Sequence, residues 1–270
     1  MFAIYLFHQS PHLFDNLADG LTLDHLWMHS ADEVSRGVMC VAEKDAAQTK
    51  AWLRTLSGRG FEGQIELLSA PDGVSEVELL RRASGRIPKG ELLILRDGAI
   101  VIAEYETLRD QTADICLIRE SAVWFRNGAQ LSKSLKGIEK GALSDGLTQI
   151  GATSEPFKPK KHLPITTAEG RLRANLRLLG IGYTSKNALE RSYTEEFAVI
   201  PPVFIHPDAE IYASMIGPYV SIGAGAVVER CVLENSIVGA GAKITHLNLE
   251  QSIIKNDAEK HAEPQRIIRP

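Results

Sequence analysis

The sequence lacks the features of membrane, nucleic-acid-binding and disulfide-stabilised proteins. It has no apolar run of about 18 residues or more, so no helix is predicted to cross a bilayer. A net charge of −4 gives no reason to expect binding to nucleic acid or to an anionic membrane. The three cysteines (Cys40, Cys116, Cys231) are far apart and odd in number, which indicates reduced core thiols. Residues 1–7 lack the basic start of a secretory signal, so we expect a cytoplasmic globular protein.

A second absence concerns the turn after the first predicted strand. Residues 2–8 are apolar and aromatic and predict a buried strand, but residues 7–17 contain no glycine, lysine or arginine. In a phosphate-binding loop, glycines let backbone amides approach the phosphate, and basic side chains neutralise its charge. The turn therefore lacks the usual means of holding a triphosphate, and the chain contains no P-loop motif.

An internal repeat is present in residues 201–260. The segment 233–238 returns sixteen residues later as 249–254, and aliphatic residues recur five or six positions apart. They are Ile205, Ile211, Ile216, Ile222, Val228, Leu233, Val238, Ile244, Leu249 and Ile254. A helix face would repeat every three to four residues and a flat strand every two. A step near six, with small residues between, predicts a prism-shaped β-solenoid of about three coils whose aliphatics point inward.

Strands and helices alternate in the first part of the chain. Predicted strands at 37–42, 64–69, 91–101, 113–118 and 122–125 are interleaved with predicted helices at 21–29, 45–56, 75–83 and 105–111. This alternation is typical of a mostly parallel sheet with both faces covered. A further helix is predicted at 137–151, a proline-containing linker at 153–166 and an amphipathic helix at 168–179. We expect an α/β domain at 1–152, a linker and connecting helix at 153–200, the solenoid at 201–260 and a tail at 261–270.

The repeat and the preceding helix resemble part of a known family. Segments 201–211, 216–223 and 233–239 look like the C-terminal left-handed β-helix of sugar-phosphate nucleotidyltransferases of the glucose-1-phosphate thymidylyltransferase type, and helix 168–179 is similar to the helix before it. The resemblance implies a nucleotidyltransferase-like α/β domain, shortened here, followed by the short β-helix. The family's Gly-rich G-G-x-G-T-R-L loop would fall in residues 7–17, where it is absent.

The resemblance also implies candidate site residues. His8, Gln9, Ser10 and His12 would contact a nucleotide, and Asp97, at the end of a predicted strand, would bind Mg²⁺ if the protein is active. The resemblance assigns no catalytic residue. A strand-end Asp-Gly pair is also common in simple turns.

Three functions remain open at this stage. The first is a divergent or inactive homologue that binds a nucleotide or nucleotide-sugar, or that acts as an assembly or regulatory subunit. The second is an active enzyme that makes an NDP-sugar from a hexose 1-phosphate and an NTP. The third is an acyl-CoA-dependent transferase that uses the β-helix, with His246 as its base. The lack of cations in the first turn favours the first function, with a homo-oligomer or a complex with an active relative formed through the β-helix.

Overall fold

The structure is a computed structural model that describes residues 1–56, 58, 61, 63–131, 135, 154–194 and 197–261. The helix predicted at 137–151 lies outside these residues. The chain divides into two compact units. The first, the α/β unit, comprises Met1–Pro11 and Leu26–His162, and the second, the β-helix unit, comprises His12–His25 and Leu163–Pro270. In the part of the chain that is described, no helix has the length and apolar character needed to cross a membrane.

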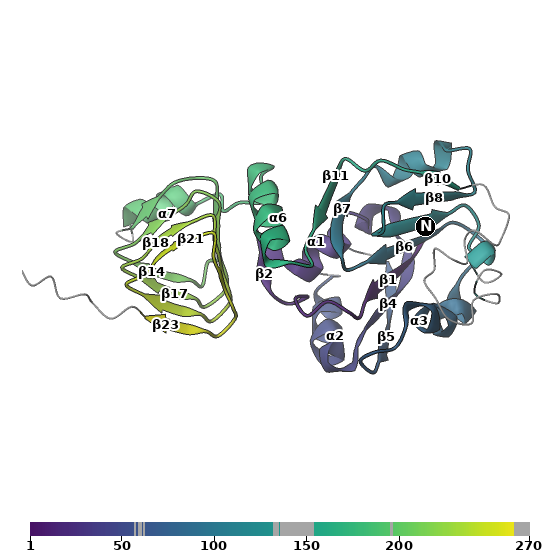
Figure 1. Cartoon of the computed structure of the whole chain (residues 1–270), viewed down its shortest axis with the longest axis horizontal. Coiled ribbons are helices and arrows are strands. Elements are labelled where there is room, and N and C mark those ends of the chain that lie inside the picture. Colours follow the sequence, from purple (N-terminus) through teal and green to yellow (C-terminus); the bar gives the residue numbers. More distant parts are fainter. Residues whose placement is uncertain are drawn as a thin grey trace, which may run out of the picture. The chain divides into compact units, whose positions relative to one another are not determined.

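The α/β unit is built on a seven-stranded sheet in the order β10-β8-β9-β6-β1-β4-β5 (Figure 1). Its strands are β1 (Phe2–Phe7), β4 (Arg36–Ala42), β5 (Gln64–Ala70), β6 (Leu92–Arg96), β8 (Ile115–Ile118), β9 (Ala122–Phe125) and β10 (Ser154–Pro156). The neighbouring pairs are parallel, except that β9 runs antiparallel to β6 and β8. The sheet confirms the predicted α/β class.

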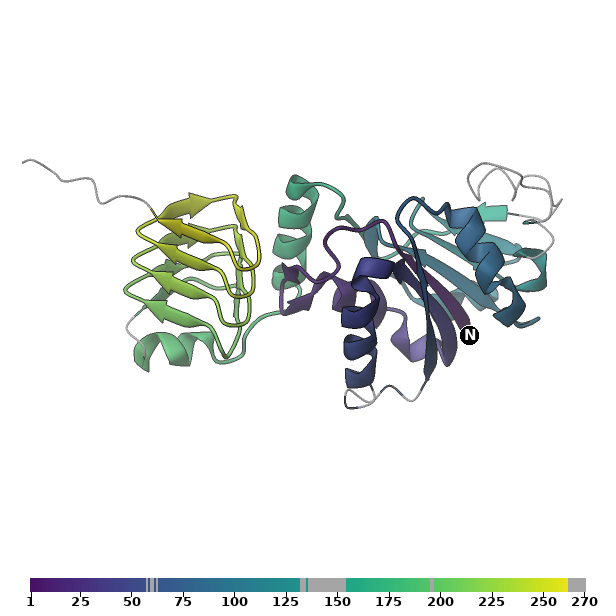
Figure 2. The same ribbon diagram turned by 90° about the horizontal axis from the view of Figure 1, so that it is seen from below.

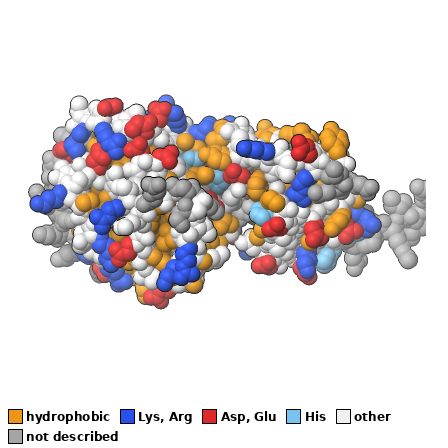
Figure 3. All heavy atoms as spheres, turned by 180° about the vertical axis from the view of Figure 1, so that it is seen from behind, with side chains coloured by type: hydrophobic (Ala, Val, Ile, Leu, Met, Phe, Trp, Pro, Cys, Tyr) orange, Lys and Arg blue, Asp and Glu red, His pale blue; other side chains and the backbone are white. Residues whose placement is uncertain are grey.

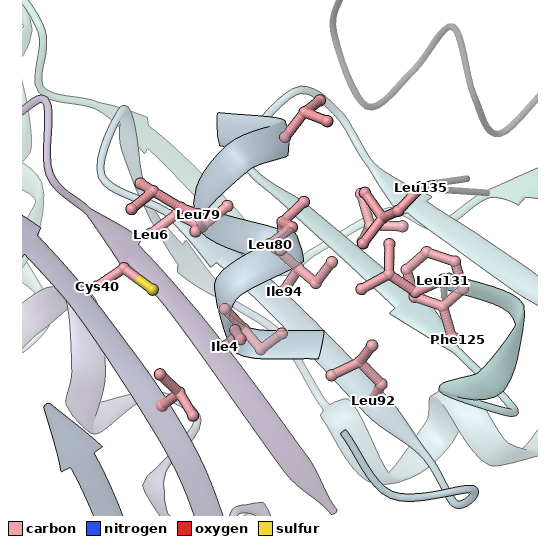
Figure 4. Close-up of a cluster of buried hydrophobic side chains, with 14 of the residues drawn as sticks. Ile4, Leu6, Cys40, Leu79, Leu80, Leu92, Ile94, Phe125, Leu131 and Leu135 are labelled. Atoms are coloured by element: carbon pink, nitrogen blue, oxygen red, sulfur yellow. The ribbon is translucent and has the colours of Figure 1, made fainter. Parts of the chain in front are cut away.

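Alternate residues of the central strand β1 face opposite sides, because side chains in a strand alternate. On one side, Ile4 and Leu6 pack with Leu79 and Leu80 of α3 (Glu76–Ala83), as Figure 4 shows. On the other, the Tyr5 hydroxyl lies 3.2 Å from Ser30 Oγ. All six residues of β1 are buried, so this strand forms the centre of the core.

Helices α1 (Thr22–Met28) and α2 (Ala46–Thr55) contribute a cluster of aromatic side chains. The Trp27 ring makes edge contacts with Trp52 and Phe61 at centroid distances of 5.6 and 5.2 Å. Short 3-10 helices follow at η1 (Ala31–Glu33), η2 (Glu43–Asp45), η4 (Ser84–Arg86) and η5 (Tyr105–Asp110).

Two helix starts and two of the predicted segments show further detail. Ser75 caps α3 by accepting a hydrogen bond from Glu78 N at 3.2 Å, whereas Asp45 precedes α2 without a side-chain cap, because η2 leads directly into that helix. The predicted strand at 91–101 is two strands, β6 and β7 (Ala99–Ile102), and the predicted linker holds β10 and β11 (Lys161–Pro164). Pro156 is accommodated because β10 is an edge strand of the sheet.

The β-helix unit stacks four coils into three parallel four-stranded sheets (Figure 2). The sheets are β12 (Ala198–Val199), β15 (Met215–Ile216), β18 (Val232–Glu234) and β21 (Asn248–Glu250); β13 (Val203–Ile205), β16 (Val220–Ile222), β19 (Ile237–Val238) and β22 (Ile253–Ile254); and β14 (Glu210–Tyr212), β17 (Val227–Glu229), β20 (Lys243–Thr245) and β23 (Glu259–His261). The unit also contains α6 (Ala168–Gly180), α7 (Ala188–Thr194) and the short pair β2 (Asn16–Leu17) and β3 (Gly20–Leu21). The architecture confirms the predicted left-handed β-helix.

The predicted inward aliphatics form the core of this unit. Nine of the ten are buried, and Leu249 is partly buried against them. At the corners, however, the backbone turns through left-handed residues that include Arg230 and His246 as well as glycines. A left-handed conformation costs an L-residue about 1–2 kcal/mol. Each coil offsets this cost by bonding to the previous one, as when Arg230 N donates to Tyr212 O and His246 N to Glu229 O.

Candidate functional site

The candidate site lies at the edge of the α/β sheet where the parallel strands end. β1 and β6 are neighbours, with Leu6 beside Arg96, so the residues that follow both strands emerge together. Residues 8–11 follow β1 and Asp97 follows β6. Ligands of open α/β sheets bind outside the carboxyl ends of the strands, and the topology therefore brings the predicted nucleotide loop and the predicted metal ligand to one edge.

Asp97 holds the loop directly. Its Oδ2 accepts hydrogen bonds from Gln9 N at 3.0 Å and from Ser10 N at 2.7 Å. Burial raises the pKa of Asp97, while the two amides and the nearby His8 act in the opposite direction. The two backbone amides that follow β1 thus already face an anion, and that anion is a side chain of the same unit.

His8 lies next to this contact. Both nitrogens of its imidazole are buried and have no hydrogen-bond partner among the described residues. A buried polar atom without a partner costs about 1–3 kcal/mol. His8 therefore has unused hydrogen-bonding capacity beside the loop amides.

The arginine beside Asp97 is turned away from the loop. The Arg96 guanidinium pairs with Glu76 at 2.6 Å and donates to Glu120 O at 2.9 Å. On the face shown in Figure 3, basic and acidic side chains are interspersed over the α/β unit, with no uniformly basic region. The contacts of the Arg96 guanidinium are thus made to Glu76 and Glu120 and not to the loop.

A serine–histidine pair lies along the same edge. Ser121, the residue before β9, has its Oγ 2.8 Å from His162 Nε2, and Arg96 N donates to Ser121 O at 2.9 Å. Burial lowers the pKa of His162, and the positive charge of Arg119 lowers it further. Ser121 is 5% exposed, so this geometry orients the imidazole and does not present the serine as a nucleophile.

His12 does not join the other predicted nucleotide contacts. It belongs to the β-helix unit, where its Nδ1 lies 2.8 Å from Asp15 Oδ2 and 3.3 Å from a guanidinium nitrogen of Arg171. Arg171 also pairs with Asp15 at 3.0 Å, and its guanidinium is almost fully buried. The structure brings together His8, Gln9, Ser10 and Asp97 and places His12 in a separate cluster. Sequence reasoning missed the partners Asp15 and Arg171.

The histidines of the β-helix lie near its corners. His246 has a left-handed backbone, with its Nε2 3.4 Å from a guanidinium nitrogen of Arg230 one coil earlier. His206 Nδ1 accepts a hydrogen bond from Asp208 N at 3.1 Å. The Asp208 carboxylate lies 3.7 Å from the same nitrogen of His206, which is farther than the 2.8 Å between Asp15 and His12. An oriented general base has a carboxylate within hydrogen-bond reach of its imidazole, and Asp208 lies beyond that reach.

Comparison with solved structures shows that the fold is similar to that of nucleotidyltransferases. HddC from Yersinia pseudotuberculosis superimposes with a TM-score of 0.51 and 9% identity over 64% of this chain and 96% of its own. The 4-diphosphocytidyl-2C-methyl-D-erythritolsynthase from Anaerococcus prevotii gives 0.52 and 10% over 66% and 98%. A Bacillus anthracis protein that carries the name glucose-1-phosphate thymidylyltransferase, solved with sucrose, gives 0.52 and 9% over 64% and 93%. At these identities the likeness concerns the fold alone.

A further structure of HddC, complexed with GMP-PN, superimposes with a TM-score of 0.50, 10% identity and coverage of 64% of this chain and 98% of its own. No protein-family model and no curated protein sequence matches the chain.

Proposed function

We propose that this protein binds a nucleotide or an NDP-sugar at the sheet edge formed by residues 8–10 and Asp97, and that it does not catalyse efficient nucleotidyl transfer. The fold supports the ligand class, since one of the similar structures is a complex with GMP-PN. The contacts of the loop support the loss of transfer. In this reading the protein is a divergent relative with a regulatory or assembly role.

One observation carries the proposal: the Asp97 carboxylate accepts hydrogen bonds from the amides of Gln9 and Ser10. Catalysis of phosphoryl and nucleotidyl transfer depends on donors and cations aimed at the phosphates. Here the two donors are satisfied by a carboxylate, whose charge repels a phosphate at the same place. A ligand must therefore bind beside Asp97 or displace it.

Among the described residues, no group of three or more histidine, cysteine, aspartate or glutamate side chains is placed to hold a metal ion. Mg²⁺ is often held by one or two carboxylates when phosphates and water complete its shell. Asp97 is a single carboxylate whose Oδ2 already accepts hydrogen bonds from two amides, and the proposed function does not require it to bind a metal ion.

A ligand panel tests this proposal. Thermal unfolding would be followed with nucleoside triphosphates, NDP-sugars and acetyl-CoA, each with and without Mg²⁺. A ligand at about one hundred times its Kd adds about 2.7 kcal/mol of stability, which is a readily measured shift in Tm. In parallel, pyrophosphate release would be measured with pairs of hexose 1-phosphate and triphosphate.

We expect stabilisation by a nucleotide or NDP-sugar without release of pyrophosphate. Turnover with any substrate pair would instead establish the active nucleotidyltransferase, and stabilisation by acetyl-CoA alone would favour the acyltransferase. A panel without any stabilising ligand would refute nucleotide binding.

Self-association through the β-helix is the second part of the proposal. Met215 and Val232 are neighbours on the sheet β12-β15-β18-β21 and remain 43% and 44% exposed, in register with Ala198. An exposed apolar column on a regular sheet is a feature of protein interfaces. Sedimentation of the full chain over a range of concentrations tests it, since a monomer at all concentrations would contradict it.

A further inference from the structure

The segment His12–His25, which we call the strap, packs against the β-helix although it directly follows the candidate ligand loop in sequence. Its strand β2 contacts β16, β19 and α6. β16 and β19 belong to the sheet β13-β16-β19-β22. The outer side of that sheet carries an aligned column of four residues, Phe204, Ser221, Ile237 and Ile253. Ser221 and Ile237 point away from the core of the β-helix and are nevertheless 0% and 1% exposed. The strap and α6 thus cover an outer face of the β-helix.

Asn175 of α6 lies at the centre of this contact. Its Oδ1 accepts hydrogen bonds from Ala18 N of the strap at 2.9 Å and from Ser221 Oγ at 2.6 Å. Its Nδ2 donates to Tyr219 O at 3.2 Å. The side chain is fully buried, so one amide group joins the strap, the helix and the second coil.

Other contacts fasten the strap along its length. The buried guanidinium of Arg171 pairs with Asp15, and Asn256 Nδ2 donates to Phe14 O at 3.3 Å. Leu13 and Leu17 are 2% and 0% exposed. These contacts come from α6 and from the last coil, so residues more than 150 positions away in sequence hold the strap in place.

We propose that the β-helix anchors the candidate ligand loop through the strap, with Asn175 as its main positioning residue. The loop is short: Phe7 is fully buried in β1, and only residues 8–11 separate it from the strap. These four residues join the strap to β1, so a strap that is held in place leaves them fewer conformations than a loose strap would. This restriction favours the conformation in which Gln9 and Ser10 donate to Asp97. The functional part of the inference, that anchoring tunes ligand binding, rests on the proposed function.

The alternative is that the strap only covers apolar surface of the β-helix. The two ideas differ in what happens to the loop when the strap is loosened. If the strap anchors the loop, the amides of Gln9 and Ser10 lose protection together with the amide of Ala18. If it only covers a surface, the amide of Ala18 alone loses protection.

Hydrogen exchange of the full chain tests this, with Asn175→Ala as the main variant. The matched control is Val228→Ala, which weakens the same unit at a fully buried position facing the core of the β-helix, away from the strap. We expect exchange at Ala18, Gln9 and Ser10 to become about tenfold faster in Asn175→Ala than in Val228→Ala, the factor that corresponds to the typical net contribution of a hydrogen bond. Asn256→Ala, at a partly exposed anchor, should give the same pattern with a smaller factor, and it replaces Asn175→Ala if that variant does not fold.

Faster exchange at Ala18 with unchanged exchange at Gln9 and Ser10 would overturn the inference, and so would equal acceleration in the Val228→Ala control. Titration with the best ligand of the panel then asks whether affinity changes in Asn175→Ala and not in Val228→Ala. The exchange result needs no ligand. Failure of all ligands to bind would therefore refute the proposed function and leave the anchoring of the loop to be decided by exchange.

Discussion

Replacement of Asp97 tests whether its carboxylate holds the loop through the amides of Gln9 and Ser10, which we call the clamp, or binds a metal ion. Asparagine keeps an oxygen that accepts from Gln9 N and Ser10 N but removes the negative charge. Alanine removes both, which frees two amides for an incoming anion. If Asp97 is a clamp, the affinity for a nucleotide should increase from the wild type to Asp97→Asn to Asp97→Ala.

The magnitude follows from Coulomb's law. Two unit charges about 5 Å apart repel each other by about 3 kcal/mol at an effective dielectric constant of about 20. Screening by salt and by the Mg²⁺ that accompanies a triphosphate reduces this repulsion. We therefore expect Asp97→Asn to bind a nucleotide about tenfold more tightly than the wild type, a difference of about 1.4 kcal/mol in binding free energy. Asp97→Ala loses two hydrogen bonds of the loop, worth about 1 kcal/mol each, and should unfold at a lower temperature.

Isothermal titration at two salt concentrations, with and without Mg²⁺, measures these effects. The gain in Asp97→Asn should shrink at high salt because it is electrostatic. Glu76→Gln is a useful control, since it changes the same net charge while touching Arg96 instead of the loop. Weaker binding in both Asp97 variants, seen only with Mg²⁺, would refute the clamp and identify Asp97 as a metal ligand.

Three further predictions address other parts of the chain. The pKa of His162 is lowered in the folded protein, so the unfolded state takes up a proton at a higher pH than the folded state does. As the pH falls through the ordinary value of 6.5, the wild type should therefore lose stability relative to His162→Gln. Urea unfolding across that pH range measures the difference. Ile222→Ala should destabilise the β-helix unit by about 2–5 kcal/mol without shifting the unfolding seen by tryptophan fluorescence, because all three tryptophans lie in the α/β unit. Val232→Lys should weaken self-association in sedimentation experiments, whereas Thr245→Lys, on another sheet, should not.

The features predictable from sequence are those that local patterns encode. The step near six residues fixes which aliphatics face inward, and a continuous apolar run marks β1 as a central strand. The cap of α3 follows from a serine three residues before a glutamate. Each of these depends on residues close together in the chain.

The strap and the Asp97 clamp were not predictable in this way, because their partners are distant in sequence. Ala18 bonds to Asn175, and Gln9 bonds to Asp97. One signal was nevertheless present. Ile237 and Ile253 directly precede the inward aliphatics Val238 and Ile254, and neighbouring side chains in a strand face opposite sides, so they face outward. At outward positions a solvent-exposed coil would carry polar residues. Apolar residues at such positions indicate that another segment covers that face.

The glycines of the repeat have a physical reason that a matched pair of variants can isolate. A Cβ on Gly239 would lie 2.5 Å from Asn256 N and 2.6 Å from Lys255 C, both backbone atoms of the next coil. A Cβ on Gly225 would meet nothing within 4 Å, so alanine there adds only the strain of its left-handed backbone, about 1 kcal/mol. Gly239→Ala forces two coils apart and breaks the inter-coil hydrogen bonds of its strand, so it should cost several times more in urea unfolding of the β-helix unit. Equal losses in the two variants would show that the coils tolerate separation, and the small residues of the repeat would then serve the corners and not the stacking.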